Sequence, residues 1–104
     1  MSKINILGTD YELVKQTVDE NSKLRNADGL CEFWAKKIVY DEVKPDYMTY
    51  ENISEYDKKV LRHEIIHAYF GESGLKEYME DETLVDWLAV QFHKIEDTFR
   101  KLNI

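Results

Sequence analysis

One stretch decides the fold: Arg62-His63-Glu64-Ile65-Ile66-His67-Ala68-Tyr69-Phe70. It contains the pattern His-Glu-x-x-His and two of the three histidines in the sequence. On an α-helix, residues four apart lie one turn above each other on the same face. His63 and His67 can therefore direct their imidazoles at one point, with Glu64 beside them. Two neutral imidazoles suit Zn²⁺, whose catalytic sites take three protein ligands and leave one position for water.

The residues around this motif predict a helix that is buried on two sides. At about 100° per residue, the two histidines share one face with Val60, whereas the opposite side is apolar. That opposite side consists of Leu61, Ile65 and Ala68. Buried charged groups need a partner or a metal, and a carboxylate next to a metal-activated water can act as its base. The alternative is that both histidines are ordinary core residues and Glu64 lies at an exposed edge.

Length, charge and cysteine content limit the class of protein. The 104 residues predict one domain spanning 1–104, and 43% hydrophobic residues argue against a disordered chain. The single Cys31 excludes an internal disulfide and fits a reducing compartment, as a small buried side chain or, with unusual placement, a metal ligand. No signal peptide or membrane-length apolar run is present, so we expect a cytoplasmic protein. The formal charge of −7 without a basic cluster argues against nucleic-acid binding. The sequence does not indicate an oligomeric state.

The first half of the chain predicts strands. Residues 4–6 alternate in strand fashion, 8–10 form a plausible turn, and 11–18 can return as a second strand. A polar loop follows, with one helical turn around 22–25. We expect a hairpin that pairs 30–33 with 38–41 across Trp34 to Lys37. The expected fold is α+β, zincin-like, with a small antiparallel sheet of about three to four strands. This sheet would pack on a buried active-site helix and a long C-terminal helix.

The second half predicts helices. Pro45 ends the sheet unit, and Ser54 reads as the N-cap of a motif helix over 55–72. A short connection over 75–80 leads to a final helix over 81–102. Its apolar residues recur every three or four positions and predict a stripe that faces the core. The stripe comprises Leu84, Leu88, Phe92, Ile95, Phe99 and Leu102.

A His-Glu-x-x-His site needs a third ligand, and the final helix offers one. Glu82 lies one turn before Asp86 on the same face, so Glu82 could bind zinc while Asp86 accepts the free ring N–H of a ligand histidine. Acidic residues in a first helical turn are also common for capping reasons alone. His93 is the rival third ligand, about 16 Å further along the helix. Glu80 and Asp81 are weaker candidates.

The chain at this point resembles a known group of enzymes. Its order is a hairpin after Gly29, the His63-Glu64-x-x-His67 helix, then Glu82-Thr-Leu-Val-Asp86-x-x-Ala89. This looks like a minimal zincin and is similar to small phage-encoded metallopeptidases related to the ImmA/IrrE family. The resemblance extends from Gly29 to about His93 and is looser over the first 28 residues.

The resemblance implies specific roles. Zinc would bind His63, His67 and Glu82, and Glu64 would be the catalytic base. The protein would act in the host cytoplasm if it is phage-encoded. An extended peptide would add by β-augmentation to a strand of the sheet. That strand comprises Ile38, Val39 and Tyr40 and extends to Glu42.

These observations lead to one favoured function and two alternatives. The favoured function is a zinc metallopeptidase that hydrolyses a protein or peptide through a metal-activated water, with Glu64 as general base. The first alternative is a metal-stabilised, non-catalytic protein that captures a peptide at the edge of strand 38–42. An acidic decoy or inhibitor is the second. Four residues are possible donors to the transition-state oxyanion, and the sequence does not choose among them. They are Tyr47, Tyr50, Tyr69 and His93.

Overall fold

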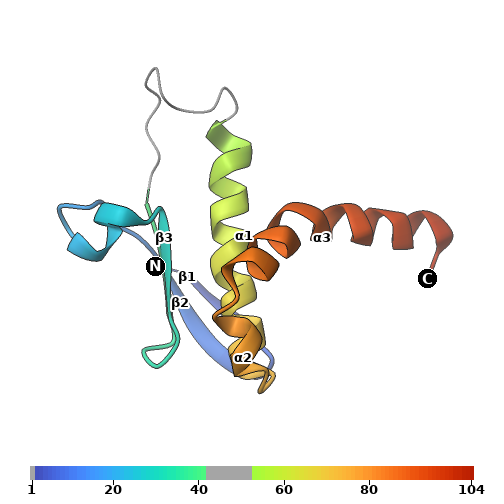
Figure 1. Ribbon diagram of the computed structural model, residues 1–104, viewed down its shortest axis with the longest axis horizontal. Helices are drawn as coiled ribbons and strands as arrows, with labels where there is room; N and C mark the ends of the chain where they lie inside the picture. Colours follow the sequence, from blue (N-terminus) through green and yellow to red (C-terminus); the bar gives the residue numbers. More distant parts are fainter. Residues whose placement is uncertain (1, 42–52) are drawn as a thin grey trace.

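The computed structural model describes residues 2–41 and 53–104 of the chain. These residues form an α+β fold with a four-stranded mixed sheet and three α-helices, the last of them long (Figure 1). The α+β class predicted from the sequence is confirmed. No helix in the described ranges combines the length and apolar content needed to cross a membrane.

The chain begins with a tight hairpin. Strands β1 (Ser2–Ile6) and β2 (Thr9–Lys15) pair antiparallel, with Ile4 opposite Tyr11. The two residues between them, Leu7 and Gly8, have φ angles of 50° and 95°. Positive φ at both central residues defines a type I′ turn, whose twist matches that of the flanking strands. The turn therefore lies slightly before the predicted position at 8–10.

A second hairpin follows a 3₁₀-helix, η1 (Ser22–Asn26), at the predicted helical turn. Strands β3 (Gly29–Glu32) and β4 (Lys37–Tyr40) pair antiparallel, with Cys31 opposite Ile38. This confirms the predicted hairpin, with both strands ending slightly earlier than expected.

The sheet is mixed, so the prediction of an antiparallel sheet is wrong for one pair. The strand order is β1-β2-β4-β3, and β2 pairs with β4 in parallel, with Leu13 opposite Ile38. After β2 the chain crosses to the far edge, forms β3 there and returns as β4 beside β2. Ile38 and Val39 on β4 are both 0% exposed. Burial on both faces is expected for a strand that takes part in a parallel pair.

This order overturns the predicted substrate strand. Ile38, Val39 and Tyr40 form β4, which has β2 on one side and β3 on the other. Its backbone donors and acceptors already serve two ladders, so an added peptide has none to bind. Within the described residues the edges of the sheet are β1 and β3. Glu42, the predicted end of that strand, is outside the described residues.

Three helices follow the sheet. Helix α1 (Ile53–Glu72) begins two residues before the predicted start, so Ser54 lies inside the helix and is not its N-cap. Helix α2 (Lys76–Met79) is a single turn within the predicted connection. Helix α3 (Glu82–Leu102) is capped by Asp81, whose side chain accepts a hydrogen bond of 3.0 Å from the backbone N–H of Leu84.

Helix α1 lies between the sheet and α3 and contacts both (Figure 1). Its Ala68 is fully buried and belongs to the main hydrophobic core, against which Leu61 and Ile65 also pack. The side predicted to be apolar thus faces the sheet. The other buried members of this core are Ile6, Tyr11 and Ile38.

Glu72 joins the C-terminal end of α1 to the sheet. Its carboxylate accepts hydrogen bonds from the Tyr11 hydroxyl at 2.5 Å, the Lys36 ammonium at 2.7 Å and the Thr9 hydroxyl at 2.9 Å. These bonds, that of Lys36 foremost, lower the pKa of Glu72 to about 2. Burial and the bond to Glu72 raise the pKa of Tyr11. The C-terminal end of α1 is therefore anchored to the sheet.

The second half of α3 departs from the prediction. Only Val85 and Ala89 of α3 are buried, whereas Phe92, Phe99 and Leu102 are 52%, 48% and 66% exposed. The first half of α3 crosses α1, and the second half extends away from the rest of the molecule (Figure 1). The predicted stripe therefore does not face the core of this chain beyond Ala89.

Candidate metal centre

Three predicted ligands meet at one point between α1 and α3. The Nε2 atoms of His63 and His67 lie 3.1 Å apart. Each lies 2.9 Å from an oxygen of the Glu82 carboxylate, Oε2 for His63 and Oε1 for His67. The ligand atoms of all three residues lie within 4.8 Å of one another. This group could hold a metal ion.

The local fold explains how the three side chains meet. The four-residue spacing on α1 places both imidazoles on the face turned toward α3. Asp81 caps α3, so the helix begins at Glu82 and places this residue in its first turn. The third ligand is thus supplied by the helix end that crosses α1.

Both ligand histidines are held through their other ring nitrogen. His67 Nδ1 lies 2.6 Å from the Met79 carbonyl oxygen, which can only accept a hydrogen bond. His63 Nδ1 lies 3.1 Å from the Asp86 carboxylate. That carboxylate is also 2.8 Å from the Lys59 ammonium, and the hydrogen bond from Lys59 is the main reason why the pKa of Asp86 is lowered. Both Nδ1 atoms therefore carry the ring hydrogen, as metal-ligating histidines usually do.

This tautomer leaves three acceptors facing one another. With hydrogen on each Nδ1, both Nε2 atoms present lone pairs, and the Glu82 carboxylate adds negative charge. Lone pairs at 2.9 to 3.1 Å repel unless protons or a cation lie between them. Donors bound tetrahedrally at about 2.0–2.1 Å from Zn²⁺ lie roughly 3.3 Å apart. The three residues fit such an ion with only a small adjustment.

Glu64 lies next to this group and is almost fully buried, at 7% exposure. Its side chain packs on the backbone of β3, since a Cβ added to Gly29 would lie 3.0 Å from Glu64 Cγ. Burial raises the pKa of Glu64 to about 7; His63 opposes this rise, and Glu82 adds to it. A carboxyl group with this pKa can both accept and return a proton near neutral pH.

The site opens toward solvent on one side. The side chain of Glu82 is 68% exposed, whereas those of His63 and His67 are 14% and 10% exposed. The two imidazoles therefore form the floor, and the carboxylate lies at the rim. A molecule could approach along this open side.

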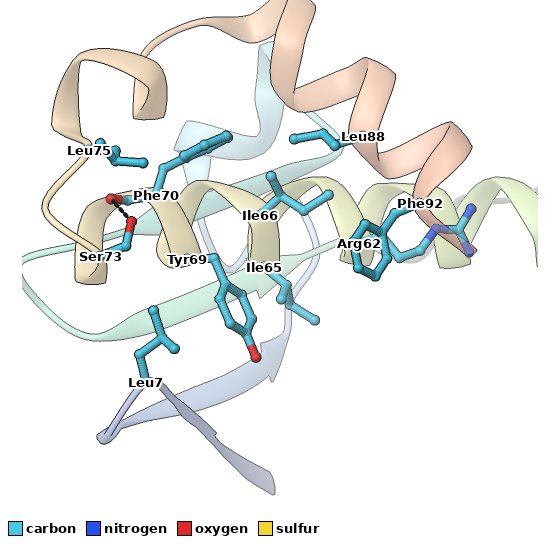
Figure 2. Close-up of a pocket in the computed structure, with 10 residues that line it drawn as sticks. All are labelled: Leu7, Arg62, Ile65, Ile66, Tyr69, Phe70, Ser73, Leu75, Leu88 and Phe92. Atoms are coloured by element: carbon cyan, nitrogen blue, oxygen red, sulfur yellow. Dashed lines mark hydrogen bonds between the residues drawn. The ribbon is translucent and has the colours of Figure 1, made fainter. Parts of the chain in front are cut away.

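The remaining candidates lie elsewhere. Cys31 packs against the hydrophobic core, burial raises its thiol pKa to about 12, and it does not belong to the ligand group. His93, Glu80 and Asp81 do not belong to the ligand group. Tyr69 lines an apolar groove with Leu7 and Phe70, on another face of α1 (Figure 2). Of the predicted oxyanion donors, Tyr47 and Tyr50 are outside the described residues.

Three features of the site were not anticipated from the sequence. Lys59 lies one turn before His63, and this spacing could have indicated its position. Gly29 could have been noticed as a residue without a side chain at the start of a strand. The Met79 carbonyl is a backbone group on α2, and no sequence pattern indicates its role.

No family model, curated protein or solved structure matches this chain. The resemblance to zincins and to the ImmA/IrrE family therefore stays a prediction from the sequence.

Proposed function

We propose that this protein is a zinc-dependent peptidase. The observation that carries the proposal is the convergence of His63 Nε2, His67 Nε2 and the Glu82 carboxylate, with both Nδ1 hydrogens already donated. Zn²⁺ suits a set of two imidazoles and one carboxylate, whereas Mg²⁺ and Ca²⁺ prefer oxygen ligands. A catalytic zinc site of this kind keeps a further position for water.

The buried Glu64 supports a catalytic role over a purely structural one. Zn²⁺ held by the three ligands supplies Lewis-acid activation of a water and of the scissile carbonyl. Glu64 accepts a proton from the attacking water and delivers it to the leaving amine. Asp86 and the Met79 carbonyl hold the two imidazoles in one orientation throughout. A structural site would not need a protonatable carboxyl group beside it.

The edge strand β3 is the best place for a peptide substrate. Within the described residues, β3 pairs with β4 on one side only, and its first residue, Gly29, contacts Glu64. An extended peptide could add to the other side of β3 by β-augmentation. Its backbone would then pass beside the carboxylate and the metal ligands. This assignment replaces the central strand β4 as the substrate strand.

The first test is zinc uptake. We expect the purified chain to bind one zinc ion, measured by elemental analysis after dialysis against zinc and then buffer. His63→Ala should weaken zinc binding by at least 100-fold. His93→Ala, a histidine outside the ligand group, should leave it unchanged. A chain that takes up no stoichiometric zinc would overturn the proposal.

The second test separates cleavage from binding. Glu64→Gln keeps the side-chain shape and cannot take a proton, so it should retain zinc and reduce hydrolysis of a library of internally quenched peptides by about 10²–10⁴-fold. If the wild-type chain binds zinc and peptides but cuts none, the chain is the metal-stabilised peptide-binding protein. If Glu64→Gln cuts as fast as the wild type, Glu64 is not the base.

A further inference from the structure

The distal half of α3 presents an apolar face that residues 2–41 and 53–104 do not cover. Beyond Ala89 no residue of α3 is buried, and this half of the helix extends away from the molecule (Figure 1). Phe92, Phe99 and Leu102 are 52%, 48% and 66% exposed. Most helical stability in proteins comes from packing of the apolar face. A helix end of this length is marginal by itself and needs a partner surface.

The spacing of these residues is that of a coiled-coil seam. The apolar positions follow one another at intervals of three and four residues, which is the a and d pattern of a heptad repeat. They are Val85, Leu88, Phe92, Ile95, Phe99 and Leu102, and we call the last five the α3 stripe. The pattern indicates that the partner of the exposed part is another helix.

An apolar groove continues the α3 stripe onto α1. It has a volume of about 510 Å³, and Leu88 and Phe92 of the stripe line it together with Ile66 and Tyr69 of α1 (Figure 2). Arg62 is the only charged residue in its lining. Its Nε donates a 2.6 Å hydrogen bond to the Ala89 carbonyl, and no carboxylate among the described residues pairs with it. The groove thus combines apolar walls with one available positive charge.

We propose that a second copy of this chain covers this surface, with the two α3 helices packed antiparallel about a two-fold axis. A register that sets Phe92 opposite Ile95 of the partner also sets Phe99 opposite Leu88 of the partner. The free end of each α3 then covers the groove of the other copy. The same surface of each copy then contacts the other copy, as a two-fold dimer requires.

Charge complementarity favours this occupant and this register. Three heptad positions of the exposed half lie beside the seam, and one of them, Glu96, is charged. The other two are Gln91 and Thr98. In the antiparallel register Glu96 falls beside Ala89 of the partner, where the partner's Arg62 is bound. Glu96 pairs with Arg100 within its own helix on an exposed surface, and such pairs contribute little. It can therefore turn to Arg62 of the partner, twice per dimer.

The exposed apolar area is close to what a stable dimer buries. Six large apolar side chains on this surface are each between 44% and 66% exposed. A large aromatic side chain can bury 150–250 Å², so together they expose roughly 600 Å². A standard interface buries about 800 Å² per partner, including its polar rim. The six are Leu7, Tyr69, Leu75, Phe92, Phe99 and Leu102.

Sedimentation equilibrium on the full chain tests this proposal. We expect a dimer of twice the 12.4 kDa chain mass that dissociates on dilution. Phe99→Asp places a charge in the seam and should weaken association by about 100-fold or more. Trp87→Ser removes an exposed apolar residue of the same helix outside the stripe and should leave association unchanged. Zinc uptake by Phe99→Asp serves as the folding control, because Phe99 is remote from the ligands.

The register has its own test. Arg62→Glu and Glu96→Arg should each weaken the dimer by about 10-fold, and the double variant should restore it. A chain that remains a monomer at high concentration overturns the proposal, as does a dimer unaffected by Phe99→Asp. A dimer that tolerates both single charge reversals overturns the antiparallel register. None of these readouts depends on peptidase activity.

Discussion

Glu64 shows how the fold alters one carboxyl group. It is buried between α1 and the backbone of β3, and this burial raises its pKa to about 7. A glutamate on an exposed surface would remain ionised at neutral pH. At this position, the protonated and ionised forms are both accessible near pH 7. The absence of a side chain at Gly29 allows Glu64 to pack this closely on β3.

Lys59 supports the candidate metal site through Asp86. Its ammonium lies 2.8 Å from the Asp86 carboxylate that also binds His63 Nδ1. We expect Lys59→Met to weaken zinc binding by up to about 10-fold, the lower end for a partner of a metal ligand, because Asp86 is less firmly held. Competition with a chromogenic chelator measures this affinity.

The neighbouring lysine is the matched control. Lys58 lies on the exposed side of α1, and within the described part of the chain its ammonium forms an ion pair with Glu55 alone. Lys58→Met should leave the zinc affinity as it is in the wild type. Equal losses in both variants would mean that total charge, and not the contact to Asp86, sets the affinity.

At the level of single residues, the sequence correctly predicts that His63, His67 and Glu82 meet in a group that could hold a metal ion. The histidine spacing places both imidazoles on one helix face, and the carboxylate in the first turn of the final helix meets them. It does not predict Gly29 or the Met79 carbonyl, because both act through the backbone. Contacts between a side chain and a distant backbone leave no periodic pattern in the chain.

At the scale of elements, Glu72 connects the C-terminal end of α1 with the sheet through three hydrogen bonds. We expect Glu72→Gln to reduce the free energy of unfolding by about 1–2 kcal/mol near pH 7, because hydrogen bonds to a charged acceptor are lost. The pKa of Glu72 is about 2 in the folded protein and has an ordinary value of 4.5. Its contribution is therefore complete above pH 4.5 and is lost as the pH falls toward 2.

Urea unfolding at several pH values measures this effect. The difference between wild type and Glu72→Gln should be largest near neutral pH and should shrink below pH 4.5. Glu77→Gln, an exposed residue of α2, should show no such difference. A constant difference down to pH 2 would contradict the assignment.

Sequence patterns predict where helices and strands lie in the chain better than they predict which strands pair in the sheet. Both hairpins, η1 and the two long helices are predicted near their observed positions. The parallel pairing of β2 with β4 is not, because local alternation carries no information about which strand returns beside which. The apolar residues of α3 recur as predicted, but the prediction that they face the core is wrong beyond Ala89, because periodicity does not show where the rest of the chain lies.

At the scale of the whole molecule, the candidate metal ligands connect α1 with α3, because His63 and His67 lie on α1 and Glu82 on α3. An ion that binds only the folded state stabilises it, by about 4 kcal/mol at a thousandfold excess over Kd. For a domain of this size, the change in Tm is on the order of 20 °C. We expect this difference between zinc-loaded and chelator-treated protein in thermal unfolding followed by circular dichroism.

Two histidine variants complete that experiment. His67→Ala should melt at the same temperature with and without zinc, since it lacks a ligand. His93→Ala should keep the full difference. If the Tm of the wild-type chain is the same with and without zinc, the ion does not hold the two helices together.

The strand order also determines the sequence in which the sheet can assemble. The β3–β4 hairpin and α1 form from contacts close in the chain, whereas β2 must find β4 across a long intervening segment, with Glu12 opposite Lys37. Closing such a segment is slow relative to local pairing. During synthesis the β1–β2 hairpin leaves the ribosome before β4, the strand with which β2 pairs in the sheet. The hairpin therefore cannot take its place in the four-stranded sheet until β4 has been made.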